Sequence, residues 1–94
     1  MIYENVLKRL RERIRTREYV LTLHAEEEMN EDGFTIFDGE RGVLTGTILE
    51  RQRDRETGES KYRIRGRTVA GDEIELLAKF GSTGWMVIIT MYEP

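Results

Sequence analysis

The sequence predicts an α+β fold: an N-terminal helix, a short strand, two short helices and a four-stranded antiparallel meander. Two observations indicate this order. Near the N-terminus, apolar residues recur at a spacing of four, which is typical of an amphipathic helix. From Thr47 onwards, segments rich in strand-forming residues alternate with the turn sequences RETGE, AGD and GSTG. A chain of 94 residues is expected to form a single domain, spanning residues 1 to 94, with the helices on one face of the sheet.

The first helix is predicted over residues 2 to 15, because an apolar stripe runs along this segment. The arginines of the segment fall elsewhere around the helix and are expected to face solvent. Residues 19 to 23, YVLTL, are rich in strand formers and predict a short strand. The stripe of the first helix consists of Ile2, Val6, Leu10 and Ile14.

Two further helices are indicated by their capping residues. Thr22 is placed to cap a second helix that ends at Gly33. Thr35 followed by Asp38 resembles a capping box that opens a third short helix, ending near Gly46. The glycines inside this third segment weaken its helix propensity.

The meander is predicted from four strands, at residues 47 to 53, 60 to 68, 73 to 80 and 85 to 92. In the second of them, KYRIRGR carries a basic side chain at every other position, so four cations share one face. An odd-length loop to the next strand pairs Arg67 with Glu75 and Arg63 with Lys79. This register leaves apolar side chains on the opposite, core-forming face: Tyr62, Ile64, Ile74, Leu76, Ala78 and Phe80.

The last hairpin is expected to close through the four residues GSTG, which pairs Phe80 with Trp85. This register assigns Trp85, Val87, Ile89 and Met91 to the core face. It assigns Met86, Ile88, Thr90 and Tyr92 to the open face.

The centre of the open face is predicted to carry unpaired positive charge. Like charges directly opposed, such as Arg63 and Lys79, destabilise a sheet unless an anion such as a phosphate lies between them. The alternative interpretation is an ordinary solvated face, in which the cations extend into water or reach Glu50, Glu59 or Glu73.

Composition and charge exclude several classes of protein. The net charge of −3 argues against indiscriminate nucleic-acid binding but permits a local cationic surface. The absence of Cys excludes disulfides and Cys-ligated metals, and the single His argues against a His-rich zinc site, so we expect no cofactor and no metal. No segment predicts a membrane span or a signal peptide, so we expect a cytoplasmic protein with no membrane partner.

Two segments of the chain resemble a bacterial domain family of unknown function, family 4258. They are LTLHAEEEMNEDGFT and TGTILERQRDRETGESKYRIRGRTVAGDEIELLAKFGSTGWMVIITMY. The shared features are a Thr-x-His-Ala helix start, a Met four positions later, a Gly-Phe-Thr opening of the next helix and a closing strand that ends Ile-Thr-Met-Tyr. The resemblance covers about residues 18 to 92. This chain departs from many relatives at Glu28 and Asp32, where they carry Arg. The acidic second helix therefore favours a basic partner or internal pairing with arginines of the first helix.

That family is similar to the RelE, BrnT and MqsR group of small ribonuclease toxins. The resemblance implies a RelE-like fold, metal-independent RNA cleavage, RNA as substrate and a cognate antitoxin of the zinc-finger type as partner. Such cleavage needs a base, cations that stabilise the phosphorane and an acid. The implied catalytic residues are His24, Lys61, Lys79 and Tyr92, and the implied substrate-binding residues are Arg51, Arg63, Arg65 and Thr90.

Several of these assignments have structural alternatives. His24 serves either as a general base or as a structural residue that fixes the strand-to-helix corner by a hydrogen bond to the sheet backbone. Tyr92 is either catalytic or an aromatic residue at a sheet edge. The function is accordingly an endoribonuclease toxin, a RelE-like domain that binds RNA or protein without cleavage, or a structural interaction domain with an ion-paired face.

Overall fold

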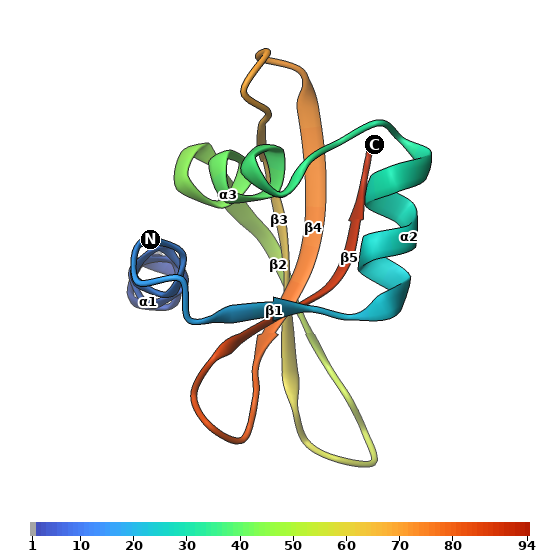
Figure 1. Ribbon diagram of the computed structural model, residues 1–94. Helices are drawn as coiled ribbons and strands as arrows, with labels where there is room; N and C mark the ends of the chain where they lie inside the picture. The colour runs from blue at the N-terminus through green and yellow to red at the C-terminus, as the bar shows by residue number, and fades with distance from the viewer. Residues whose placement is uncertain (1) are drawn as a thin grey trace.

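The computed structural model describes residues 2 to 94 and contains three helices and a five-stranded mixed sheet (Figure 1). None of the helices in this part of the chain is long and apolar enough to cross a membrane. In chain order the elements are α1 (Glu4–Arg15), β1 (Tyr19–Leu21), α2 (Leu23–Glu31), α3 (Ile36–Thr45), β2 (Thr47–Arg53), β3 (Ser60–Arg67), β4 (Glu73–Phe80) and β5 (Met86–Tyr92).

The sheet has the order β1-β5-β4-β3-β2, and the predicted antiparallel meander forms four of its strands. The prediction was incomplete for β1, which joins the sheet as a fifth strand parallel to β5. Both helix caps predicted after β1 are confirmed. The Thr22 hydroxyl accepts a hydrogen bond from Ala25 N, and Thr35 and Asp38 form a capping box.

The helices do not all cover one face of the sheet. α1 and α3 lie on one side of the strands, whereas α2 lies beside β5, to the right in Figure 1. The reason is that β1 pairs only with the first part of β5, so the outer backbone groups of the remaining part need other partners. α2 provides them: the Thr22 hydroxyl donates to Ile89 O, Met91 N donates to Glu28 Oε1, and Glu93 N donates to Asp32 Oδ2.

These contacts give the acids at positions 28 and 32 a role within the fold. Glu28 and Asp32 accept hydrogen bonds from backbone N–H groups at the end of the sheet. Within residues 2 to 94 neither acid forms an ion pair with an arginine of α1, which was one of the two roles expected for them. The carboxylates of Glu28 and Asp32 thus attach α2 to the edge of β5, and their negative charge accepts hydrogen bonds within the fold.

The core lies between the sheet and the layer formed by α1 and α3. Gly42 and Gly66 allow α3 to approach β3 closely, because a side chain on Gly66 would overlap the carbonyl group of Gly42. A methyl group on Gly42 would lie 2.7 Å from Ile74 Cγ2. The glycines that weaken the helix propensity of this segment are therefore required by its packing. The largest fully buried side chains are Leu10, Val43, Ile64, Ile74, Leu76, Met86, Ile88 and Met91.

The predicted register between β3 and β4 was wrong by two residues, which leaves the assignment of faces intact. Arg65, rather than Arg67, lies opposite Glu75, and Arg63 lies opposite Leu77 instead of Lys79. The core face therefore contains the apolar residues that were predicted, although the partners on the open face change.

The predicted register of the last hairpin was wrong by one residue, which exchanges the faces of its first half. Phe80 pairs with Met86, so Met86 and Ile88 are buried, while Trp85 is 40% exposed and Val87 lies opposite Lys79. The loop is one residue longer than predicted, since Gly81 N donates to Trp85 O, and Gly84 adopts a φ of +87° within it.

A β-bulge near Ile89 restores the predicted faces in the second half of β5. Ala78 pairs with Ile88, but Leu77, which precedes Ala78 in β4, pairs with Thr90, so that Ile89 is the extra residue. The extra residue returns Met91 to the core and places Thr90 and Tyr92 on the open face, as predicted.

Candidate functional site

The open face of the sheet brings side chains from three adjacent strands to one point. β3 supplies Arg63 and Arg65, β4 supplies Glu75 and β5 supplies Tyr92. Glu75 lies between Arg65 and Tyr92 in the register of the sheet. We call these four residues the Glu75 cluster.

Glu75 is the buried centre of this cluster, with only 3% of the residue exposed. Its Oε1 accepts hydrogen bonds from Arg63 Nη1 at 3.1 Å and from Arg65 Nη2 at 2.9 Å and Nε at 3.2 Å. Its Oε2 accepts a hydrogen bond from the Tyr92 hydroxyl. Arg63 also donates from Nε to Glu50 Oε1 at 2.9 Å. Every polar atom of this buried carboxylate is therefore satisfied, as the cost of burying a charge demands.

The surroundings of Glu75 and Tyr92 shift their pKa values in opposite directions. Burial raises the pKa of the Glu75 carboxyl, but hydrogen bonds from Tyr92 and Arg65 and the charges of Arg63 and Arg65 outweigh burial, and the pKa is lowered. The hydrogen bond to Glu75, burial and the Glu75 charge raise the pKa of Tyr92. Near neutral pH, Glu75 is therefore ionised and Tyr92 protonated.

The prediction of unpaired cations at the centre of the open face was wrong. Two arginines of the cluster face two acids, Glu50 and Glu75, so the local charges balance. Lys79, which was predicted to oppose Arg63, instead forms an ion pair with Glu59 at 3.0 Å. The error follows from the register, because the two-residue shift moves Glu75 from Arg67 to the space between Arg63 and Arg65.

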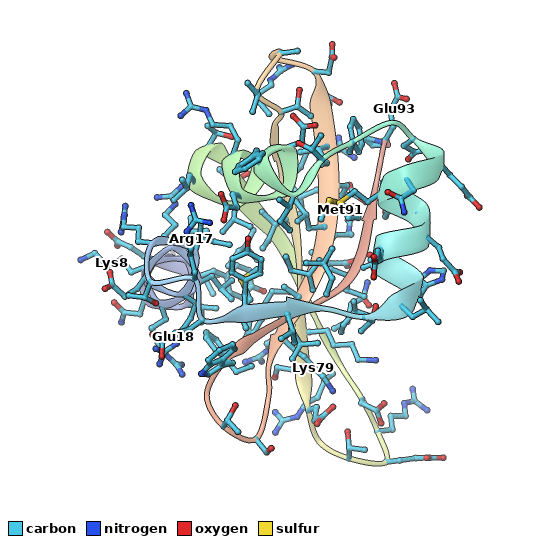
Figure 2. The ribbon with its side chains drawn as sticks, in the orientation of Figure 1. Lys8, Arg17, Glu18, Lys79, Met91 and Glu93 are labelled. Carbon is cyan, nitrogen blue, oxygen red and sulfur yellow. The ribbon has the colours of Figure 1, made fainter. Side chains whose placement is uncertain are left out.

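The predicted catalytic lysines do not lie at the Glu75 cluster. Lys79 is four residues from Glu75 along β4, a separation of about 13 Å at 3.3 Å per residue. Figure 2 shows Lys79 toward the hairpin end of the sheet, away from Met91, the neighbour of Tyr92. Lys61 lies opposite Gln52, also toward that end of β3. Both lysines could contact only a ligand that extends along the sheet.

The remaining predicted residues divide between the two faces. Thr90 lies on the open face opposite Leu77, and is therefore close to the Glu75 cluster. Arg51 lies opposite Tyr62, whose ring meets that of Tyr3, the N-cap residue of α1, at a centroid distance of 6.3 Å. Arg51 is thus on the helix side of the sheet and is not brought together with Arg63 and Arg65.

His24 lies on α2 beside β5, and within residues 2 to 94 its imidazole forms no hydrogen bond to the sheet backbone or to the Glu75 cluster. Its Nε2 is 3.3 Å from Glu28 Oε1, and 64% of its side chain is exposed. The hydrogen bond to the sheet backbone that was predicted for His24 is made by Glu28 instead. The structure therefore places His24 beside the edge of the sheet, next to Glu28, which itself binds the sheet backbone.

The residue that sequence reasoning missed is Glu75. A signal was present, because Glu75 is an acid in the middle of a strand whose neighbours, Ile74 and Leu76, are apolar. An acid in the middle of such a strand, facing a row of arginines, indicates a buried ion pair once the register is known.

The family model for a domain of unknown function, DUF4258, matches residues 21 to 93 of the chain. The chain belongs to this family. The match begins at the end of β1 and includes every residue of the Glu75 cluster, while α1 lies before it. No curated protein and no solved structure matches the chain.

Proposed function

We propose that this DUF4258 domain is a RelE-like endoribonuclease that cleaves RNA without a metal ion on the open face of its sheet, as a cytoplasmic toxin does. The observation that supports this proposal is the Glu75 cluster. It fixes two guanidinium groups and a tyrosine hydroxyl around one ionised carboxylate on the face opposite the α1–α3 layer. These are the groups that phosphate binding and proton transfer require.

The arginines would bind the phosphate through the N–H groups that the cluster leaves unused. Arg63 uses Nε and Nη1, and Arg65 uses Nε and Nη2, in hydrogen bonds to Glu50 and Glu75. Within residues 2 to 94, Arg63 Nη2 and Arg65 Nη1 donate to no protein group. Their side chains are 32% and 42% exposed, so a phosphate reaches them from solvent. Guanidinium groups held in place in this way lose little entropy when they bind an anion.

The hydrogen bond from Tyr92 to Glu75 suits a proton relay. In this step the RNA 2′-oxygen bonds to phosphorus and the bond to the 5′-oxygen breaks. The 2′-hydroxyl proton passes to Tyr92 Oη while the phenol proton passes to Glu75. Water protonates the leaving 5′-oxygen, and the hydroxide that this forms takes the proton from Glu75. The relay lets a buried carboxylate act as the base, since Tyr92 lies more exposed than Glu75. The products are a 2′,3′-cyclic phosphate and a 5′-hydroxyl.

The purified protein should therefore cut a labelled single-stranded RNA in the presence of EDTA and leave these two termini. An RNA with 2′-O-methyl groups throughout should stay intact, because it lacks the nucleophile. Gel separation of fragments and chemical identification of their ends provide the measurement. An Arg63→Gln/Arg65→Gln variant, purified in parallel, controls for host nucleases. Cleavage that EDTA abolishes, equal cleavage by this variant, or intact RNA would contradict the proposal.

One observation favours a second function, in which the domain binds RNA or protein without cleavage. Both oxygens of Glu75 already accept hydrogen bonds, and the charges of the cluster are balanced once Glu50 is included. A carboxylate in this state also serves simply to hold two arginines in position for recognition. Intact RNA, together with salt-dependent binding that is lost in the Arg63→Gln/Arg65→Gln variant, would identify this function.

A cognate antitoxin of the zinc-finger type is part of the primary proposal, because a ribonuclease that acts on cellular RNA must be held inactive in its own cell. We propose that the antitoxin covers the open face and thereby blocks Arg63, Arg65 and Tyr92. Co-expression of a zinc-finger antitoxin that binds this face should then remove the RNA cleavage described above.

A further inference from the structure

A cleft next to the Glu75 cluster has no role in the function proposed above. Its volume is about 230 Å³, and it lies where β2 and β3 meet at the end of α3. The side chains that line it include Thr47 and Leu49 from β2, Arg65 and Arg67 from β3, and Glu73 from β4, which lies opposite Arg67. Arg65 belongs to both the cleft and the Glu75 cluster, so a ligand in one is adjacent to a ligand in the other.

We propose that this cleft binds the nucleotide unit adjacent to the phosphate at Arg63 and Arg65, so that the RNA strand runs along β3. The inference rests on the proposed function in one respect, namely that RNA occupies the open face. Arg67 binds the next phosphate, and the nucleoside lies against Leu49 and Thr47.

The spacing of the arginines suits a chain of phosphates. Arg63, Arg65 and Arg67 alternate along one face of β3, so their Cα atoms are about 6.6 Å apart. The step from Arg65, which shares the first phosphate with Arg63, to Arg67 is therefore comparable to the separation between successive phosphates in a nucleic-acid strand. A ligand with a single anionic group would contact the arginines at only one of these positions along β3.

Arg67 is available to a ligand because its contacts within the protein are weak. Its Nη2 is 4.0 Å from Glu73 Oε1, both side chains are largely exposed, and Nη1 donates to Gly71 O at 3.3 Å. An exposed ion pair at this distance contributes little and yields to a phosphate. Arg65, by contrast, is fixed by Glu75.

The opposite wall of the cleft suits a nucleoside. Thr47 lies opposite Arg65 and its hydroxyl makes no hydrogen bond within residues 2 to 94, so it is free to pair with a sugar or base. Leu49 is 41% exposed because a β-bulge between Ile48 and Glu50 redirects it. An exposed apolar side chain beside a free hydroxyl matches the apolar face and polar edge of a nucleoside.

The volume of the cleft suits one unit of a longer ligand better than a whole small molecule. Pockets for drug-sized ligands begin at about 300 Å³, and this cleft is smaller. An acidic peptide is the other ligand that two arginines attract, and the test distinguishes it from RNA.

The test measures binding of a fluorescein-labelled 2′-O-methyl hexaribonucleotide, which cannot be cleaved, by fluorescence anisotropy at several salt concentrations. Arg67→Gln should weaken binding about tenfold and reduce the slope of log K against log salt by about 0.7. Thr47→Val should weaken binding about threefold and leave the slope unchanged, since it removes a hydroxyl and no charge. The matched control is Arg53→Gln, which removes an exposed cation at the hairpin end of β2 and should change affinity less than twofold.

Equal effects of Arg67→Gln and Arg53→Gln would overturn the inference, as would displacement of the probe by hexaglutamate at lower concentrations than by unlabelled RNA. Absence of probe binding by the wild-type protein would also overturn it. The result is independent of the cleavage assay. If the wild-type protein cleaves RNA while Arg67→Gln and Arg53→Gln bind the probe equally well, only the cleft assignment fails. If the Arg67→Gln loss appears in a protein that leaves RNA intact, only the cleavage proposal fails.

Discussion

Replacing Glu75 by Ala is expected to lower the free energy of unfolding by about 3 kcal/mol, near the lower limit for removing one partner of a buried ion pair. The carboxylate accepts hydrogen bonds from Arg63, Arg65 and Tyr92, and its removal leaves these donors without their common acceptor. The loss is not larger because both arginine side chains are partly exposed and can turn toward water. Urea unfolding followed by circular dichroism measures the change.

The matched control is Glu73→Ala, which removes a glutamate from the same strand and the same face. Glu73 is exposed and 4.0 Å from Arg67, so its removal should cost less than about 0.5 kcal/mol. Similar losses for the two variants would show that Glu75 is an ordinary surface acid.

Replacing Tyr92 by Phe is expected to reduce the rate of RNA cleavage by at least about 100-fold, within the usual range for loss of a proton-transfer group. The substitution keeps the ring and removes only the hydroxyl that donates to Glu75 Oε2. Because that hydroxyl links the 2′-oxygen to the buried carboxylate, its loss interrupts the relay while phosphate binding through Arg63 and Arg65 continues. Single-turnover cleavage should show the loss in the rate of the chemical step, with RNA affinity changed less than threefold.

Tyr62→Phe is the control for this variant. Tyr62 is in the same sheet but on the helix side, where its ring contacts that of Tyr3, so its hydroxyl is not placed to serve the open face. Cleavage by Tyr62→Phe should remain within twofold of the wild-type rate. A Tyr92→Phe variant that cleaves as fast as Tyr62→Phe would exclude the relay.

The elements of this fold could be predicted from the sequence because their signals are local. The hydroxyl of Thr22 and the Thr35–Asp38 pair mark helix starts through contacts three residues away, and both caps are present. Alternation in KYRIRGR places the arginines on one face whatever the partner strand. These features depend on neighbours in the chain and need no knowledge of tertiary contacts.

The centre of the candidate site could not be predicted, because it depends on register. A shift of two residues between β3 and β4 keeps every side chain on its face but moves Glu75 from Arg67 to Arg65. The length of the last loop and a bulge near Ile89 then decide which residues of β5 face the core. The position of α2 was also missed, since it depends on how far β1 extends along β5.

The lowered pKa of Glu75 has a definite effect on stability. A carboxyl whose pKa is lower in the folded protein than in the unfolded chain stabilises the fold above the unfolded value, and this stabilisation is lost as pH falls through the folded value. Wild-type protein should therefore lose more stability than Glu75→Gln between neutral pH and pH 3, because the glutamine cannot be protonated.

The most direct test of the account is the titration of the Glu75 side-chain carboxyl, followed by its ¹³C chemical shift in wild-type protein and in Arg63→Gln/Arg65→Gln. We predict a pKa below the ordinary glutamate value in the wild-type protein. In the variant the pKa should rise, because burial and the Tyr92 hydrogen bond then act without the two guanidinium groups. A wild-type pKa at or above the ordinary value, or one that the double substitution leaves unchanged, would contradict a site organised around an ionised Glu75.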